Sequence, residues 1–305
     1  MEYVLETQSL CKRYKQFTAL SELDMHVPKG SIYGFVGRNG AGKTTLIRLI
    51  CGLQVPTSGV YTLWGVKNNE KGITNMRRRM GAVVETPSIY LDMTAKENLQ
   101  QQCRVLGLPD EKYIGDVLSL IGLSDTGKKK ARNFSLGMRQ RLGIGIALIG
   151  EPDFLVLDEP INGLDPQGII EIRELILRLN REKQITVLIS SHILDELSRL
   201  ATHYGIIDGG RMVKEFSAEE LERACRKCTR VEVTDTRILA RVLDRMQLSY
   251  QIIDDRTADI YASPTVSVLS AALQKENCEL YSVKERDESL ESYYVSLVGE
   301  AKKAQ

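Results

Sequence analysis

Eight consecutive residues constrain the fold of this chain more than any other feature. The stretch from Gly37 to Thr44 reads Gly-Arg-Asn-Gly-Ala-Gly-Lys-Thr, which fits the pattern GxxxxGK followed by Ser or Thr. The apolar run Ile32–Val36 before it is typical of a buried strand, and residues 44–53 after it have a helical pattern. Glycines let backbone N–H groups surround phosphate, and a helix N-terminus adds a favourable dipole. With both neighbours present, the stretch predicts a phosphate-binding loop rather than a chance glycine-rich turn.

Apolar runs and helical patterns alternate over the first 216 residues. Residues 154–157 and 185–189 are further buried-strand candidates, and residues 169–179 have the pattern of an amphipathic helix. Such strands suit the interior of a parallel sheet with covering helices. We therefore expect an α/β fold over residues 1–216.

Between Thr94 and about residue 130 the pattern changes to helices without strands. Thr94-Ala-Lys-Glu97 has the form of a capping box, and Leu99, Cys103 and Leu106 then mark one helix face. We expect a helical subdomain at about residues 86–150.

The sequence changes again near Ser217, where a charged helix begins that we interpret as a linker. Beyond it the patterns predict a strand at Val231 and Val233, then a helix, two short strands, a second helix and a last strand. The order βαββαβ predicts a small α+β domain within residues 217–305.

Two carboxylates, Asp158 and Glu159, follow the buried run that begins at residue 154. Asp158 is suited to the shell of a Mg²⁺ ion, and Glu159 to accepting a proton from an attacking water. In the loop, Lys43 can reach the β- and γ-phosphates and the Thr44 hydroxyl can ligate the metal. His192 follows a third strand, so we expect it at the same end of the sheet, in contact with the γ-phosphate. An apolar run that ends in two carboxylates is, taken alone, also compatible with an ordinary strand end.

A further helix start precedes these carboxylates at Ser135-Leu-Gly137-Met. Ser135 is suited to an N-cap, and Gly137 permits a close approach of backbone. Taken alone, this segment is either a second phosphate-binding surface or an ordinary capped helix.

Together these motifs resemble the nucleotide-binding subunit of an ATP-binding cassette (ABC) transporter, over roughly residues 3–216. The resemblance covers five ordered motifs: Walker A, signature, Walker B, D-loop and H-loop. They correspond to Gly37, Arg38, Asn39, Gly40, Ala41, Gly42, Lys43, Thr44 and Thr45; to Ser135 and Gly137; to Asp158 with catalytic Glu159; to Asn162-Gly-Leu-Asp165; and to His192.

The resemblance implies a P-loop NTPase that binds ATP and Mg²⁺ and works as a head-to-tail homodimer. ATP would lie between Walker A of one subunit and the other subunit's signature, with Asp165 also at the nucleotide. Tyr14 matches the aromatic residue that stacks on adenine, an interpretation we favour over a buried core tyrosine. The Arg38 side chain is expected to point outward.

Glu85 departs from the family pattern, which usually has glutamine in the Q-loop. It would still offer oxygens near the nucleotide and the metal, but it adds a negative charge. Glu85, the Ser-Leu-Gly-Met signature and the Asn-Gly-Leu-Asp-Pro D-loop together resemble the bacitracin and lantibiotic self-protection exporters.

These resemblances imply an ATPase subunit at the cytoplasmic face of the cell membrane that powers a separate polytopic permease, exporting a peptide antibiotic for resistance or immunity. The 41 basic and 40 acidic residues give a net charge of +1, which argues against a nucleic-acid partner. Three alternatives remain: a cytosolic ABC ATPase acting on ribosomes or DNA, an exporter of another substrate, and a regulatory module whose tail senses a ligand. We favour a tail that stabilises the dimer.

Overall fold

The computed structural model describes residues 2–225, 228–262 and 264–286, and five positions between residues 293 and 299. Within them the chain divides into two compact units: the first takes the residues up to Ala218 and the described positions from Leu297 on, and the second begins at Glu219. Each unit has its own cluster of buried apolar side chains.

The main sheet of the first unit has six strands in the order β10-β9-β3-β8-β7-β6. Strands β9, β3, β8, β7 and β6 are parallel, and β10 pairs antiparallel with β9. Every residue of β3, β7 and β8 is buried, which confirms the expected α/β fold with a covered parallel sheet. The strands are β3 (Ile32–Val36), β6 (Met80–Val83), β7 (Phe154–Asp158), β8 (Thr186–Ser191), β9 (His203–Asp208) and β10 (Arg211–Ser217).

A second sheet in this unit, of order β2-β1-β4-β5, is antiparallel and was not predicted from the sequence. Its register shifts several times along β1, once between Thr7 and Leu10. Each bulge interrupts the alternation of apolar and polar residues that would reveal a strand. The strands are β1 (Tyr3–Tyr14), β2 (Phe17–Pro28), β4 (Ser58–Leu63) and β5 (Val66–Lys67).

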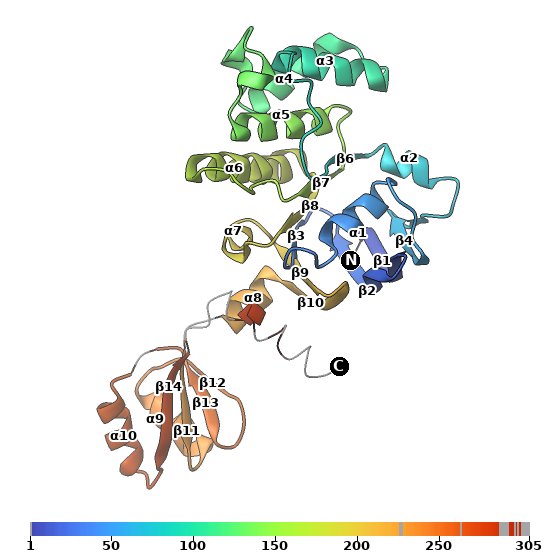
Figure 1. Ribbon diagram of the computed structural model, residues 1–305. Helices are drawn as coiled ribbons and strands as arrows, with labels where there is room; N and C mark the ends of the chain where they lie inside the picture. Colours follow the sequence, from blue (N-terminus) through green and yellow to red (C-terminus); the bar gives the residue numbers. More distant parts are fainter. Residues whose placement is uncertain are drawn as a thin grey trace. The chain divides into compact units, whose positions relative to one another are not determined.

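Helices α3, α4 and α5 form a separate group at the top of Figure 1. They span Ala95–Leu106, Asp110–Leu120 and Leu136–Leu148, with two 3-10 turns at Ser124–Thr126 and Ala131–Asn133. The remaining helices of the unit lie closer to the sheets. They are α1 (Lys43–Ile50), α2 (Ile73–Arg77), α6 (Pro166–Lys183) and α7 (Leu194–Ser198).

Helix α3 begins at the predicted capping box. The Thr94 side chain accepts a hydrogen bond from the Glu97 N–H at 3.2 Å, and the Glu97 carboxylate accepts one from the Thr94 N–H at 2.6 Å. The hydrogen bond from the Thr94 backbone N–H and a further one from Lys130 hold the pKa of the Glu97 carboxyl below its usual value. Leu99 and Cys103 are buried as expected, but Leu106 is 47% exposed because it is the last residue of the helix.

Replacing Thr94 with alanine should therefore destabilise the protein by about 0.5–2 kcal/mol, the usual effect of losing an N-cap. Urea denaturation followed by circular dichroism measures this free energy of unfolding. Thr74→Ala, at an exposed site on α2, is the matched control and should change it by less than about 0.5 kcal/mol. Equal effects of the two substitutions would contradict the capping role.

The second unit has the predicted order βαββαβ. It consists of β11 (Cys228–Val233), α9 (Thr236–Arg245), β12 (Tyr250–Ile252), β13 (Thr257–Ile260), α10 (Val266–Gln274) and β14 (Leu280–Arg286), preceded by α8 (Ala218–Ala224). Its four strands form an antiparallel sheet of order β12-β13-β11-β14. Buried Val231 and Val233 on β11 pack with Leu239 and Leu243 of α9 in the core.

None of the helices in the described part of the chain combines the length and the apolar character needed to cross a bilayer.

Candidate active site

The parallel register of three neighbouring strands brings the site together. Strand β8 lies between β3 and β7, with Val36 opposite Ser191 and Asp158 opposite Ser190. All three strands run in the same direction, so the segments that follow them leave the sheet at one edge. Those segments are the phosphate loop, Glu159 and His192.

The phosphate loop needs glycine at two positions for reasons that the structure makes explicit. A Cβ atom on Gly37 would lie 2.6 Å from the Ile207 carbonyl oxygen. Gly42 has φ +111, and a Cβ there would lie 2.6 Å from the Ala19 carbonyl oxygen. The loop can therefore pack against β2 and β9 only with glycine at these positions. Its outer part, which includes the Arg38 side chain, is exposed.

Lys43 folds back across this loop and reaches Glu159, the residue that follows β7. Its ammonium group donates to the carbonyl oxygens of Gly37 at 2.5 Å and Arg38 at 3.3 Å. It also lies 3.1 Å from Glu159 Oε1, and its side chain is only 6% exposed. The ion pair is thus largely shielded from water. Because of this shielding, its two charges interact more strongly than they would at the surface.

Glu159 is also in contact with His192, whose Nδ1 lies 2.8 Å from Glu159 Oε2. One carboxylate therefore joins the lysine of the loop to the histidine that follows β8. Its backbone is unusual, since Glu159 has φ +50 in the left-handed region. The structure thus brings Lys43, Glu159 and His192 into one connected group.

Asp158 is 1% exposed, and its two carboxylate oxygens have different surroundings. Oδ1 accepts a hydrogen bond from Ser190 Oγ at 2.6 Å. Oδ2 is buried without a hydrogen-bond partner. A buried carboxylate oxygen is costly unless something pairs with it, and carboxylates are the side chains that usually bind Mg²⁺ in nucleotide sites. Asp158, with the partly exposed Thr44 at the start of α1, therefore fits a magnesium ion.

Glu85 interacts with a residue outside this group. Its carboxylate pairs with Arg48 of α1 at 2.6 Å, and its side chain is 56% exposed. Arg48 engages only one carboxylate oxygen, Oε1, so the other oxygen is the one available for a role at the nucleotide or the metal. This partner could not be predicted from the sequence, because nothing in the spacing of the two residues links them.

Tyr14 ends β1 with its ring at the surface, 38% exposed. Its hydroxyl donates to Gln54, and Lys12 Nζ lies 5.2 Å from the ring centre. Tyr14 is therefore not the buried core residue that was the alternative interpretation.

The signature residues lie against the D-loop of the same chain. Ser135 caps α5 by accepting a hydrogen bond from the Met138 N–H at 3.2 Å. The nearest atoms to a Cβ on Gly137 would be Gly168 Cα and the Leu164 side chain, at 3.8 and 3.9 Å. Asp165 caps α6 through the Gly168 N–H at 3.1 Å.

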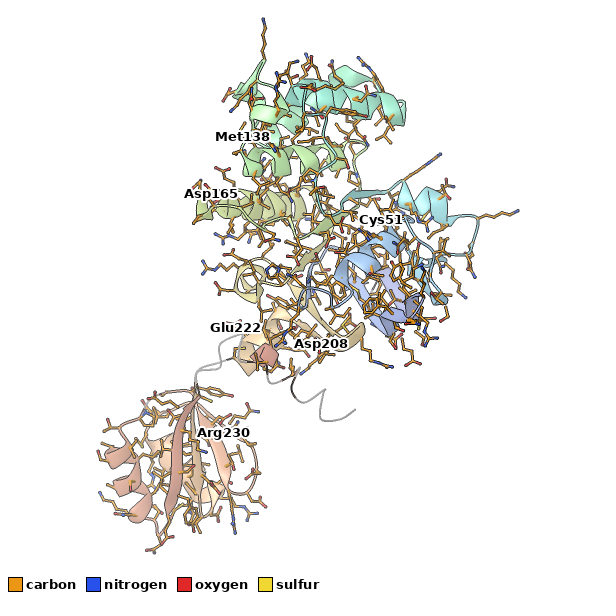
Figure 2. All side chains as sticks on the ribbon, viewed as in Figure 1. Cys51, Met138, Asp165, Asp208, Glu222 and Arg230 are labelled. Atoms are coloured by element: carbon orange, nitrogen blue, oxygen red, sulfur yellow. The ribbon has the colours of Figure 1, made fainter. Side chains whose placement is uncertain are left out.

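Figure 2 labels a residue near the start of each of these two helices and the residue that follows α1. Met138 and Asp165, labelled at the starts of α5 and α6, lie well apart from Cys51 at the end of α1. The sequence contains one such signature segment and one phosphate loop.

The site combines a phosphate loop, a buried carboxylate suited to a metal ion and an adjacent glutamate at one edge of a parallel sheet. This combination defines a nucleotide-hydrolysing P-loop protein. Comparisons with known proteins identify its family. Residues 20–162 match the family described as ABC transporter. The bacitracin transport ATP-binding protein BcrA of Enterococcus faecalis is 38% identical over 304 residues, which cover 98% of this chain and 97% of that protein.

Two further proteins show how far the likeness extends. The lantibiotic transport ATP-binding protein SrtF of Streptococcus pyogenes is 40% identical over 219 residues, which cover 71% of this chain and 93% of that protein. Among solved structures, cbiO1 from Clostridium perfringens, part of the ABC transporter complex cbiONQ, superposes with a TM-score of 0.67 and 25% identity, covering 81% of this chain and 97% of its own.

This chain belongs to the family of ABC transporter ATP-binding proteins. It binds ATP and hydrolyses it, and the hydrolysis is coupled to transport. Subunits of this family dimerise and work with a membrane permease.

Proposed function

We propose that this ATPase powers the export of a peptide antibiotic of the bacitracin type through a separate polytopic permease, and so confers resistance or immunity. The observation that carries the proposal is the extent of the match to BcrA, which spans both compact units. The match to SrtF covers only 71% of the chain. The longer match to BcrA therefore favours bacitracin over a lantibiotic as the cargo.

We propose that hydrolysis begins with an exchange of partners at Lys43. In the structure the Lys43 ammonium lies 3.1 Å from Glu159. The γ- and β-phosphates of ATP are more highly charged than this carboxylate, so they replace it as the partner of Lys43 when ATP binds. Glu159 is then free to accept the proton of the attacking water. His192, at 2.8 Å from Glu159, is placed to hold both this carboxylate and the γ-phosphate.

The remaining site residues have proposed roles at the nucleotide. The loop from Gly37 to Thr45 surrounds the phosphates, and exposed Tyr14 stacks on adenine. Thr44 and Asp158 would hold Mg²⁺, together with Glu85. The ion would supply positive charge that stabilises the negative charge developing on the phosphate.

We propose that two copies complete each other's sites. The sequence has one signature and one phosphate loop, which supports a head-to-tail homodimer, in which Ser135, Gly137 and Asp165 meet ATP bound to the partner. The subunit would act at the cytoplasmic face of the membrane, where it meets the permease.

The two compact units are, in this proposal, domains with a boundary near residue 217, and the second stabilises the dimer. Light scattering with and without ATP tests whether the second unit stabilises the dimer. Removal of residues 218–305 should weaken ATP-dependent dimerisation. Unchanged dimerisation would instead favour a ligand-sensing tail.

A strain of the host that lacks the gene tests the proposed cargo. We expect a bacitracin growth threshold at least several-fold lower than in the parent, restored by the wild-type gene but not by Glu159→Gln. A panel of lantibiotics and unrelated drugs is measured in parallel. Normal bacitracin tolerance with increased sensitivity to another compound would contradict the proposed cargo and identify a different one.

A further inference from the structure

Ser190 on β8 lies directly opposite Asp158 on β7, and its hydroxyl links both carboxylate residues of the site. Ser190 Oγ donates to Asp158 Oδ1 at 2.6 Å and accepts from the Glu159 backbone N–H at 2.9 Å. A serine hydroxyl can donate one hydrogen bond while accepting another, so both bonds form at once. Ser190 is 0% exposed, so no water competes for either bond.

The first of these bonds determines which oxygen of Asp158 is free. Because Ser190 occupies Oδ1, the oxygen that remains without a hydrogen-bond partner is Oδ2. A carboxylate held by one fixed donor cannot turn freely about its last side-chain bond. Ser190 therefore orients the oxygen that is proposed to face the metal.

The second bond holds the backbone of Glu159. Its φ of +50 lies in a region that residues other than glycine rarely adopt, and such conformations persist where neighbouring groups hold them. The Glu159 N–H donates to Ser190, and its carbonyl oxygen accepts from the Asn162 N–H at 3.1 Å. The direction of the Glu159 side chain toward Lys43 and His192 depends on this conformation.

We propose that Ser190 is a positioning residue for ATP hydrolysis, which fixes the Asp158 carboxylate and the Glu159 backbone without itself touching the nucleotide. The parallel register of β7 and β8 puts it there, directly across from Asp158. This inference rests on the proposed roles of the two carboxylates.

Three substitutions in the full-length chain separate the hydroxyl from the space it fills. Ser190→Cys keeps nearly the same volume but replaces a strong hydrogen-bonding group with a weak one. Ser190→Ala removes the group, and Ser190→Thr retains it.

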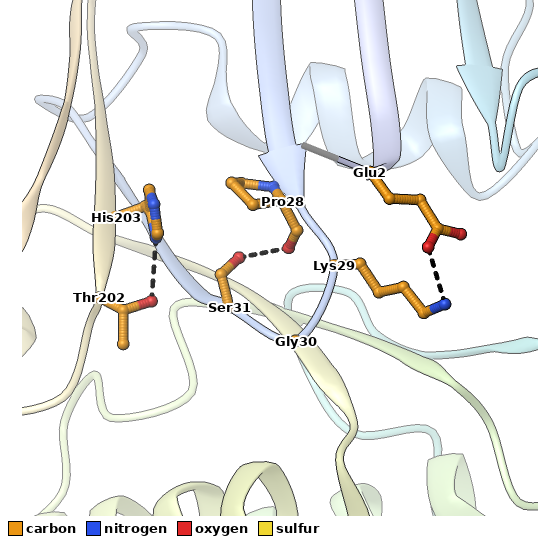
Figure 3. Close-up of a pocket in the computed structure, with 7 residues that line it drawn as sticks. All are labelled: Glu2, Pro28, Lys29, Gly30, Ser31, Thr202 and His203. Atoms are coloured by element: carbon orange, nitrogen blue, oxygen red, sulfur yellow. Dashed lines mark hydrogen bonds and ion pairs between the residues drawn. The ribbon is translucent and has the colours of Figure 1, made fainter.

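Ser31→Ala is the matched control, because it removes another buried hydroxyl at the other end of the sheet. Ser31 is 4% exposed and donates to the Pro28 carbonyl oxygen at 2.6 Å. Figure 3 shows it lining a pocket of about 350 Å³, immediately before β3 begins.

In Ser190→Ala and Ser190→Cys we expect kcat to fall about 10- to 100-fold, since a misplacement of about 1 Å can cost this much. ATP affinity without divalent metal should stay unchanged. The affinity for Mn²⁺ in the presence of a non-hydrolysable ATP analogue, measured by electron paramagnetic resonance, should fall several-fold. Ser190→Thr should restore both values, and Ser31→Ala should keep both while losing thermal stability.

Wild-type kcat and Mn²⁺ affinity in Ser190→Cys would overturn the inference, and so would equal losses in Ser31→Ala. Failure of the proposed function would look different: turnover in Glu159→Gln would match that of the wild type. A catalytically dead Glu159→Gln beside a fully active Ser190→Cys would leave the proposed function intact and reject only the role of Ser190.

Discussion

Glu159→Gln should lower ATP turnover by about 10²–10⁴-fold, the usual contribution of a positioned general base. The amide keeps the shape of the carboxylate but cannot accept the proton of the attacking water. ATP binding should persist or become tighter, because the substitution removes the charge that lies 3.1 Å from Lys43 in the structure. Steady-state phosphate release and equilibrium titration with a fluorescent nucleotide measure the two effects separately.

Glu174→Gln provides the matched control for this prediction. Glu174 is exposed on α6, so the same change of charge there should leave turnover and binding unaltered. Turnover in Glu159→Gln within about threefold of the wild type would exclude Glu159 as the base, since acid–base groups contribute far more.

Lys43→Ala should weaken ATP binding roughly 10- to 100-fold, because hydrogen bonds to charged groups contribute about 1.5–3 kcal/mol each. The buried ammonium group contacts two carbonyl oxygens of the loop and Glu159, and it is proposed to bind the phosphates that the loop would hold. Titration with the fluorescent nucleotide reports the affinity without any need for turnover.

Lys183→Ala, at an exposed position on α6, should bind ATP like the wild type. Circular dichroism verifies that both variants are folded. If Lys43→Ala retained wild-type affinity while folded, the loop would bind phosphate through backbone groups alone and the proposed role of Lys43 would be lost.

The sequence allowed the central sheet and the family to be predicted because their signals are local. Strand β3 coincides with the predicted run, and the second unit has the expected order of elements. Both depend on apolar runs and periodicities within a few residues. The antiparallel sheet of β1, β2, β4 and β5 escaped prediction because its bulges break that periodicity.

The partners of the site residues were harder to predict than the residues themselves. The phosphate loop and the carboxylates are contiguous motifs, whereas the bond from Ser190 to Asp158 joins residues 32 positions apart through the register of two strands. One sequence signal was available: Ser190 is a polar residue at the end of an apolar strand. The Arg48–Glu85 pair, 37 positions apart, had no such signal.

Affinity capture of the tagged protein from detergent-solubilised membranes of its own host, with mass spectrometry of the bound proteins, tests most directly whether this chain powers a separate permease. We expect a polytopic membrane protein that lacks its own ATP-binding cassette to be recovered with both the wild type and Glu159→Gln. Recovery of ribosomal or DNA-repair proteins with no membrane protein would contradict it.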